Sequence, residues 1–355
     1  MGFGGSDNYS VFHRSSESLD KLEKALTDSS LVVGFNIKFD LHWLRRYGLQ
    51  ISGKVWDCQY AHFLLTAQKE AYPSLQGVCE HYGIKGKIAH IEDMYWSKGI
   101  DTPDIPEKEM LAYLEQDLRA TEEVYQRQLK ELEANPKLLN LFKLHMDDLL
   151  VLQDMEYNGL LLDTEGSKKR AQEVKDEIVS IEKQLSSRYP HVAINWDSGD
   201  QLSAYLFGGP IATERREVVG IYATGAKIGQ PRFRVHHDVV NLPRLVDPIE
   251  GSELAKADKE KGTGPWSTAE DVLTQLRGVQ EVKPLLRRAE LTKLLDYLEG
   301  WPELIAEKDW RPNEVHGQFN QVRARTGRLS SSSPNQQNLP DEMLKYVITR
   351  YPLPF

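Results

Sequence analysis

The junction between an apolar run and a helical pattern near the N-terminus most constrains what this chain can form. Residues 31–34 are apolar and rich in β-branched side chains, which predicts a buried strand. The spacing of Phe39 and Trp43 predicts a helix over residues 37–47. Asp40 falls in the first turn of that helix, near the carboxyl end of the strand, where open α/β sheets place their chemistry. The sequence therefore predicts an α/β domain with a candidate site at this strand end.

A second polar pair lies within a long helical pattern over residues 107–133. Tyr113 and Asp117 are four residues apart there, so they share one helix face. A carboxylate can bind a divalent metal ion, and a tyrosine hydroxyl can orient the water that attacks a phosphodiester. The alternative is that this pair is an ordinary helix-surface contact, and that Asp40 is simply favoured by the dipole of its helix.

Near the C-terminus, residues 323–338 form what we call the polar strip, which combines arginines, hydroxyls and amides with no acidic residue. Its arginines offer forked donors for phosphates or groove edges, and its amides can contact sugars and base edges. The candidate DNA contacts are Arg323, Arg325, Arg328, Asn335, Gln337 and Asn338. The alternative, a polar loop joining two elements, explains the turn-forming residues but not the arginines.

The composition of the 355 residues indicates a soluble globular chain of about two domains. No run approaches the roughly twenty apolar residues of a membrane helix, and no signal peptide opens the chain, so we expect a cytoplasmic protein, in the host cytoplasm if it is viral. Cys58 and Cys79 are the only cysteines, which leaves no disulfide framework and no cysteine zinc site. The net charge of −9 argues mildly against nucleic-acid binding, but local charge decides, and it is basic at residues 323–328.

The polar strip resembles the T-G-R-L-S-S-x-x-P-N-L-Q-N-I-P signature of family A DNA polymerases, the group of bacterial DNA polymerase I and many phage replicases. Gln336 stands where Leu is usual, and Ala324 stands where Thr is frequent. Residues 155–163, which read M-E-Y-N-G-L-L-L-D, are similar to the start of that family's thumb. The resemblance implies a DNA-directed DNA polymerase of phage type that binds primer-template DNA and deoxynucleotides (dNTPs).

The same resemblance assigns roles within the strip. Arg328 aligns with the arginine that reads the primer-terminal minor groove, where hydrogen-bond acceptors lie at similar places in every correct base pair. The three amides align with contacts to the template strand. Four cations of the thumb region are candidates for tracking the duplex phosphates, although a solvated helix face explains them nearly as well. They are Lys283, Arg287, Arg288 and Lys293.

The N-terminal motifs resemble those of DnaQ-like 3′-5′ exonucleases. Asn36 to Asp40 fits the N-x-x-F/Y-D motif called Exo II, and Tyr113 with Asp117 fits the Y-x-x-x-D form of Exo III. The resemblance implies a proofreading nuclease in which Asp40 and Asp117 bind Mg²⁺ or Mn²⁺ of a two-metal site, Tyr113 orients the water, and Asn36 contacts the single-stranded 3′ end. The family's first motif, D-x-E, does not occur before Asn36, so we expect an incomplete metal site; Asp7 is a weak candidate ligand.

The resemblance also implies a domain organisation. We expect an exonuclease domain at residues 1–135 that lacks its first strand, a thumb at 136–310 with an insertion around 210–265, and the truncated start of a palm at 311–355. The first domain should have the RNase H-like, DnaQ-type α/β fold with a mixed sheet. The thumb should be mostly α-helical with a small β excursion. We therefore expect an internal fragment of a monomeric proofreading polymerase.

Two other functions remain open, a stand-alone exonuclease of the DnaQ or RNase D type and a non-catalytic DNA-binding module. In every case we expect no membrane association. If the exonuclease prediction is right, Asn36, Asp40, Tyr113 and Asp117 should converge at one end of the sheet, with the two carboxylates within roughly 8 Å of each other. With two carboxylates where the family uses four, metal binding should be weak and digestion of single-stranded DNA poor.

Overall fold

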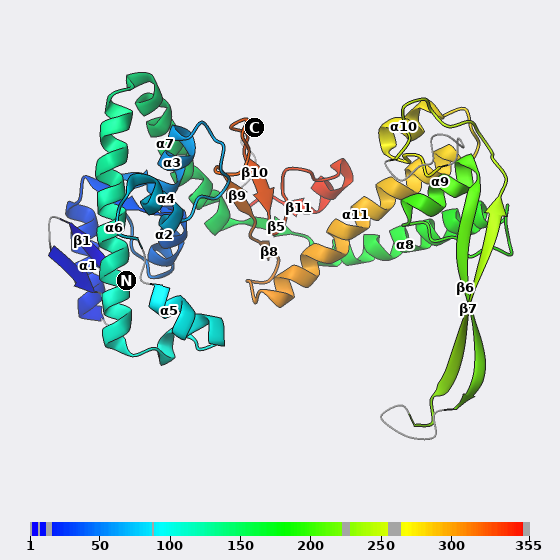
Figure 1. Ribbon diagram of the computed structural model, residues 1–355, viewed down its shortest axis with the longest axis horizontal. Coiled ribbons are helices and arrows are strands. Elements are labelled where there is room, and N and C mark those ends of the chain that lie inside the picture. The colour runs from blue at the N-terminus through cyan, green and yellow to red at the C-terminus, as the bar shows by residue number, and fades with distance from the viewer. Residues whose placement is uncertain are drawn as a thin grey trace. The chain divides into compact units, whose positions relative to one another are not determined.

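The computed structural model describes residues 2–5, 8–11, 16–86, 89–221, 228–254 and 264–350, and it divides into two units (Figure 1). The first unit comprises residues 1–161 and 314–339, and the second comprises residues 162–313 and 340–355. The chain therefore leaves the first unit after the exonuclease-like motifs and later returns to it. The whole polar strip, residues 323–338, belongs to the first unit.

The elements of the first unit are two strand pairs, seven helices, two short 3₁₀ turns and the short strands around the return of the chain. They are β1 (Gly2–Gly5), β2 (Asn8–Val11), α1 (Ser16–Asp28), β3 (Leu31–Gly34), α2 (Ile37–Arg46), β4 (Lys54–Asp57), α3 (Cys58–Leu65), α4 (Leu75–Tyr82), α5 (Ala89–Met94), η1 (Trp96–Lys98), η2 (Thr102–Asp104), α6 (Glu107–Glu133), α7 (Pro136–Asn158), β5 (Leu160–Leu162, which ends at the boundary of the units), β8 (Glu314–Val315), β9 (Gln318–Asn320) and β10 (Ser330–Ser332).

The centre of the first unit is the parallel pair β3 and β4, in which Val32 lies opposite Val55 and Gly34 opposite Asp57. Each strand leads directly into a helix, β3 into α2 and β4 into α3. The carboxyl ends of both strands therefore meet at one edge, which is also where the two helices begin. This confirms the strand and helix that the sequence predicts on either side of Asn36, with α2 ending one residue earlier than expected.

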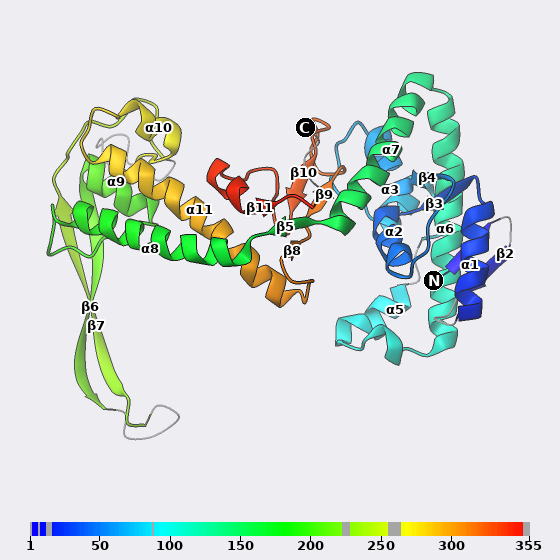
Figure 2. The same cartoon turned by 180° about the vertical axis from the view of Figure 1, so that it is seen from behind.

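Two long helices flank this strand pair. Helix α6 packs against β3, α3 and α4, and α7 packs against β4 and α2 (Figures 1 and 2). Trp56 of β4 joins the layers, because its ring lies 5.0 Å from that of Tyr125 on α6 and 4.3 Å from that of Phe142 on α7. Burial of such aromatic rings supplies much of the favourable free energy of a core of this size.

The strands at the N-terminus form a hairpin of their own. Strands β1 and β2 pair antiparallel, with Phe3 opposite Ser10, and both contact α6. The expected mixed sheet is not continuous in the part of the chain that is described, because β1–β2 and β3–β4 are separate two-stranded sheets.

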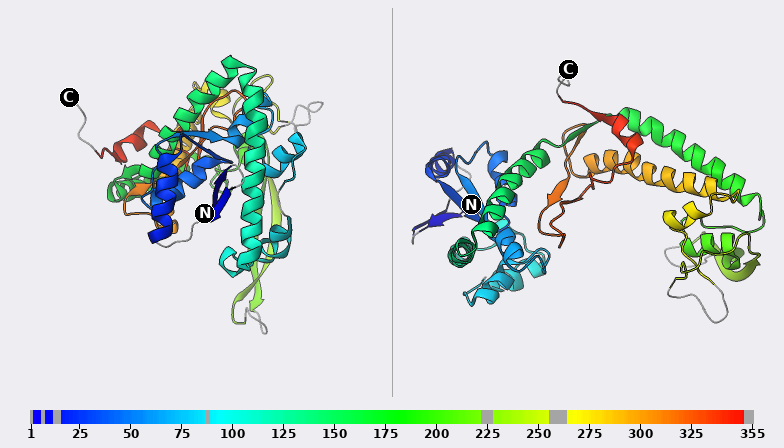
Figure 3. Two further views of the ribbon diagram at one scale, coloured as in Figure 1. Left: turned by 90° about the vertical axis from the view of Figure 1, so that its left-hand side faces the viewer. Right: turned by 90° about the horizontal axis from the view of Figure 1, so that it is seen from above.

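The second unit is built on two long helices. Its elements are α8 (Thr164–Ser186), α9 (Gly199–Phe207), β6 (Gly209–Ile221), β7 (Pro231–Leu242), α10 (Glu270–Gln275), α11 (Val282–Glu307), η3 (Asp341–Tyr346) and β11 (Val347–Ile348). Helices α8 and α11 lie side by side (Figure 3), and they run antiparallel, since Ser167 bonds to Leu298 whereas Glu182 bonds to Arg288. The mostly helical character expected for this region is therefore found.

The β excursion of the second unit is a long antiparallel hairpin of β6 and β7. It lies where the sequence predicts an insertion, around residues 210–265. Its base is anchored in the core of the unit, where Ile211 is buried opposite Val240, and the ladder continues from there to exposed Val218 and Phe233. Among the described residues, no helix combines the length and the apolar character required to cross a bilayer.

Candidate functional site

The site at the strand edge begins with the turn that links β3 to α2. Asn36 adopts a left-handed conformation, φ 56° and ψ 47°, which Asn tolerates better than most residues. Its backbone N–H donates to Oδ1 of Asp57 at the end of β4, at 3.0 Å. The same oxygen accepts from the N–H groups of Gln59 (2.8 Å) and Tyr60 (3.4 Å), so Asp57 caps α3. One carboxylate therefore fixes the starts of both helices.

Asp57 and Asp40 form an electrostatically coupled pair of carboxylates. Asp57 is 4% exposed, and burial raises its pKa to about 6 in spite of its three backbone hydrogen bonds. The protein atoms packed around the carboxyl group of Asp40, and then the negative charge of Asp57, raise the pKa of Asp40 to about 6 as well. The side chain of Asp40 nevertheless keeps contact with solvent, and water moderates such a shift. A cation bound at Asp40 would offset both effects and lower the pKa of this carboxyl group.

Asp57 is the residue of this site that sequence reasoning missed. The available signal was positional, because Asp57 follows a buried strand and directly precedes a helix, as a capping residue does. Two buried strands that each end beside an aspartate and a helix start predict neighbouring carboxylates whenever the strands pair in parallel.

Tyr113 and Asp117 lie one turn apart on α6, as expected, and both are half-buried. The Tyr113 ring packs edge-on against Trp96, with 5.6 Å between centroids, and the carbonyl of Asp117 accepts a hydrogen bond from Thr121 at 2.8 Å. Helices α2 and α6 both contact β3, so they flank the same strand. The convergence of Asp40 and Asp117 within roughly 8 Å stays a prediction.

The described residues supply an incomplete donor set for a metal ion. Within the described ranges, no three His, Cys, Asp or Glu side chains are arranged as a metal site. Asp40 and Asp117 offer two carboxylates, fewer than a closed cluster requires. Asp7, the weak candidate for a further ligand, lies outside the described residues.

The polar strip presents three arginines to solvent. Arg323, Arg325 and Arg328 are all exposed, and within the described part of the chain none of them has an ion-pair partner. The turn between them is closed by the N–H of Gly327, which donates to the carbonyl of Ala324 at 2.9 Å. Gly327 has φ 71°, a conformation that favours glycine. Three guanidinium groups are thus available to an anionic partner.

The other polar side chains of the strip divide into two groups. Gln337 and Asn338 are exposed, but Asn335 is half-buried and its Oδ1 accepts from the N–H of Gln337 at 2.9 Å. Two serines of the strip serve the local structure. Ser331 is buried and accepts from the N–H of Gln336, and Ser332 accepts from Asn320 on the paired strand.

The candidate phosphate contacts on the thumb-like helices include two arginines that are engaged internally. Arg288 is 9% exposed and binds Glu182 at 2.7 Å and Asp197 at 2.8 Å. Arg287 pairs with Glu177 at 2.9 Å. The suggestion that these two track DNA phosphates is therefore wrong for Arg288, because a buried guanidinium between two carboxylates cannot reach a phosphate, and Arg287 must first break its pair. Lys283 and Lys293 are exposed.

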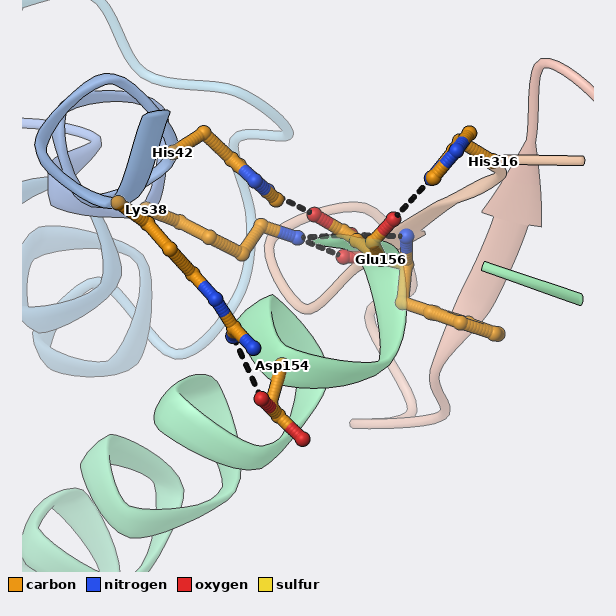
Figure 4. A network of polar contacts seen from close by, with 7 residues as sticks. Lys38, His42, Asp154, Glu156 and His316 are labelled. Atoms are coloured by element: carbon orange, nitrogen blue, oxygen red, sulfur yellow. Dashed lines mark hydrogen bonds and ion pairs between the residues drawn. The ribbon is translucent and has the colours of Figure 1, made fainter. Parts of the chain in front are cut away.

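The C-terminal end of α7 holds a buried polar network that the sequence motifs did not suggest (Figure 4). The Glu156 side chain, 5% exposed, accepts from Nζ of Lys38 at 2.6 Å and from Nε2 of His42 at 2.7 Å. It also accepts from the backbone N–H of Phe319 at 2.5 Å. Burial alone would raise the pKa of Glu156, but these hydrogen bonds and the charge of Lys38 lower it below its usual value. The network joins α2, α7 and β9 within the first unit.

Comparison with known proteins finds one family that matches the N-terminal part of the chain and another that matches its C-terminal part. The family described as 3′-5′ exonuclease matches residues 5–133, and the family described as DNA polymerase family A matches residues 245–350. DNA polymerase I of Chloroflexus aurantiacus is 27% identical over 318 residues, which cover 86% of this chain and 28% of that protein. DNA polymerase I of Bacillus subtilis is 26% identical over 302 residues, 84% of this chain and 28% of that protein.

A solved structure agrees at the level of the fold. The polymerase domain of Pol1 from M. smegmatis, in complex with DNA primer-template and dNTP, superimposes with a TM-score of 0.61 at 20% identity. The match covers 92% of this chain and 46% of that one. The chain spans 28% of the length of the Chloroflexus relative. The chain therefore combines a region that matches the 3′-5′ exonuclease family, residues 5–133, with a region that matches DNA polymerase family A, residues 245–350, and it is similar over most of its length to bacterial DNA polymerase I.

Proposed function

We propose that the protein is a DNA-directed DNA polymerase that replicates DNA and removes mispaired 3′ ends, and that this chain supplies its proofreading region and part of its grip on the primer-template. The observation that carries the proposal is the polar strip. Its three exposed arginines have no carboxylate partner in the described residues, although the chain as a whole has a net charge of −9. Unneutralised cations on one segment are what binding to a phosphate backbone requires.

Within the strip we assign the contact at the primer terminus to Arg328. The guanidinium is a planar fork that can bridge two groove acceptors, and such acceptors occupy similar places in every correct base pair. Arg323 and Arg325 would neutralise nearby phosphates, and Gln337, Asn338 and the amide group of Asn335 would contact the template strand. The M. smegmatis polymerase, which shares the fold, is bound to primer-template and dNTP, and this supports both as partners here.

For the exonuclease region we propose that a single-stranded 3′ end binds at the edge formed by Asn36 and Asp40. Asn36 is exposed and held in position by Asp57, so its amide is available to a nucleotide. Asp40 and Asp117 would bind Mg²⁺ or Mn²⁺, which would supply electrostatic stabilisation of the phosphodiester, and the Tyr113 hydroxyl would orient the attacking water. The raised pKa of Asp40 supports a cation there, since a positive charge would offset both the burial of the carboxyl group and the negative charge of Asp57.

Several finer assignments belong to the same proposal. We assign residues 1–135 to the DnaQ-type, RNase H-like fold, on the parallel strands β3 and β4 with the helix that follows each. We propose that the protein acts as a monomer in the cytoplasm, as suits a replicative enzyme. The division into exonuclease, thumb and palm at residues 135 and 310 also remains a proposal.

A non-catalytic DNA-binding module is the second candidate. It is favoured by one observation, that no group of three metal-binding side chains is arranged as a site in the described ranges. Metal-dependent digestion of a single-stranded DNA, abolished by Asp117→Ala, would exclude it. Binding of DNA without any digestion would favour it over the nuclease.

The experiment that tests the proposal compares Arg328→Lys with the wild-type chain on two DNAs, a primer-template with a recessed 3′ end and a continuous duplex. Lysine keeps the charge but loses the fork, so affinity for the primer terminus should fall more than affinity for the duplex. Arg127→Lys, an exposed arginine on α6, is the matched control. Circular dichroism establishes that all three proteins are equally folded.

The salt dependence of DNA affinity is a second measurement. Each arginine of the strip that neutralises a phosphate should contribute about 0.9 to the slope of log affinity against log salt, so Arg325→Ala should reduce that slope by about this amount. Equal affinity of wild type and Arg328→Lys for both DNAs, together with an unchanged slope for Arg325→Ala, would reject the role of the strip.

A further inference from the structure

Strand β9 is held to helices α2 and α7 by two hydrogen bonds at a single residue, Phe319. The N–H of Phe319 donates to Oε1 of Glu156, and the carbonyl of Phe319 accepts from Nζ of Lys38, which itself pairs with the same Oε1. We call Lys38, Glu156 and Phe319 the clamp. Figure 4 shows the side chains of Lys38 and Glu156 pointing toward each other from α2 and the end of α7.

The geometry of α7 explains why its end can reach β9. The helix ends at Asn158, and Gly159 follows with φ 64° so that the chain turns back. A Cβ on Gly159 would lie 2.7 Å from the carbonyl of Val315 and 2.8 Å from the ring of His316, so glycine is needed for this approach. Nδ1 of His316 donates to the carbonyl of Glu156 at 2.9 Å and so satisfies a group that the helix leaves open.

A carboxylate suits this position because it only accepts hydrogen bonds and can serve three donors with two oxygens. Glu156 accepts from both a Lys ammonium and a His ring, and its side chain is 5% exposed. Removing one partner of such a buried pair leaves an uncompensated charge, which is far more costly than losing an exposed pair. The neighbouring Arg45–Asp154 pair also links α2 to α7 but lies at the surface, where ion pairs contribute little.

The clamp connects two places to which we have assigned DNA contacts. Lys38 lies two residues before Asp40 on α2. Phe319 lies opposite Ser331 in the β9–β10 ladder, and β10 begins two residues after Arg328. A continuous chain of contacts therefore runs from the first turn of α2 through β9 and β10 to the arginines of the polar strip.

We propose that Lys38 and Glu156 are positioning residues, which hold β9, and through its pairing with β10 the polar strip, at a fixed place on the helix that carries Asp40. The part of this inference that concerns DNA rests on the proposed function of the strip. That the clamp holds β9 and β10 in place does not depend on what the strip binds.

Three variants test the clamp. Glu156→Gln keeps the shape of the side chain and removes its charge. Glu156→Gln combined with Lys38→Met also removes the ammonium that the single variant would leave unpaired, so it keeps the test open if the single variant fails to fold. Asp154→Asn is the matched control, since Asp154 lies on the same helix and also pairs with α2, but at the surface.

The first measurement is hydrogen exchange without DNA, on peptides from β9 and β10 and, for reference, from α3. In Glu156→Gln and in the double variant we expect at least about tenfold faster exchange in β9 and β10 and no change in α3, because loss of the clamp lowers the local cost of opening. Asp154→Asn should match the wild type. Wild-type exchange rates in β9 and β10 of either folded clamp variant would overturn the proposal.

The second measurement is the ratio of affinities for a primer terminus and for continuous duplex. In Glu156→Gln this ratio should fall about tenfold, as is usual when a supporting residue is lost, while affinity for the duplex is kept because the arginines remain. A purely structural defect would lower both affinities together. Fast exchange with an unchanged ratio would overturn the positioning role. If the wild type itself shows no preference for a primer terminus, the function proposed for the strip fails, and hydrogen exchange still decides the clamp.

Discussion

Replacing Asp57 by Asn should remove a pH-dependent loss of stability from the first unit. Asp57 accepts hydrogen bonds from three backbone N–H groups, yet burial outweighs them and raises its pKa from 3.8 to about 6. A change of that size in a pKa corresponds to roughly 3 kcal/mol of differential stability between the two protonation states. Asn keeps the oxygen that accepts the N–H groups and carries no charge, so it isolates this contribution.

The sign of the effect follows from proton binding. Between about pH 4 and about pH 6 the folded state binds more protons at Asp57 than the unfolded chain does, so wild-type stability falls as the pH rises through this window. The full penalty of roughly 3 kcal/mol is present above the window and absent below it. The unfolding free energy of Asp57→Asn relative to wild type should therefore be larger at about pH 7.5 than at about pH 4 by this amount.

The assay is urea unfolding at the two pH values, read by pulsed hydrogen exchange on peptides from α3 so that it reports the first unit. Asp154→Asn serves as the control, because it removes an exposed carboxylate from the same unit. The pKa of Asp40 should also fall in Asp57→Asn, since the charge of Asp57 is the second cause, after burial, that raises it. A stability difference between Asp57→Asn and wild type that is the same at both pH values would refute the reasoning.

Four further substitutions test, by urea unfolding, the packing within each unit. Arg288→Met should destabilise the second unit by about 2–3 kcal/mol, because the buried guanidinium loses its hydrogen bonds to Glu182 and Asp197 while both carboxylates keep contact with water, whereas Arg287→Met should cost at most about 1 kcal/mol. Phe142→Ala should destabilise the first unit by about 3–5 kcal/mol, since its ring packs 4.3 Å from that of Trp56. Gln336→Leu should stabilise it by about 1 kcal/mol, because Nε2 of Gln336 is buried with no hydrogen-bond partner among the described residues.

The elements that the sequence predicts well are those whose signals are local. The helix expected over residues 107–133 has the same bounds as α6, and Asp163 caps α8 by accepting from the N–H of Gly166 at 2.9 Å. Helix α7 starts at Pro136, because Asn135 caps it and proline suits a first turn. Capping and turn chemistry act within a few residues, so a linear sequence carries them.

The interactions that determine the site are of long range, and no local pattern encodes them. Lys38 is 118 residues from Glu156 and 281 residues from Phe319, and Asp57 acts on Asn36 across 21 residues. Knowing that α2, α7 and β9 are present does not predict that they meet. Only the parallel pairing of β3 with β4 and the return of the chain after residue 313 bring these groups together.

One signal in the sequence nevertheless identifies the internal ion pairs, namely a charged residue on the buried stripe of a helix. Leu149, Leu152 and Glu156 follow helical spacing along the buried face of α7, and Leu285, Arg288 and Leu291 do the same on α11. A charge at such a position must be paired inside the protein, because an unpaired buried charge is too costly. Both residues are indeed paired.

The same rule separates the cations that can serve DNA from those that cannot. Arg288 lies on the buried face of α11 and is paired inside the protein. The arginines of the polar strip lie outside any helix and face solvent. The affinity of this chain for nucleic acid should therefore depend on the number of cations without a carboxylate partner and not on its 44 Lys and Arg residues or its net charge. Arg325→Ala should change the salt dependence of DNA binding, and Arg287→Met should change stability with little effect on it, so the two variants together separate the roles of charge in binding and in folding.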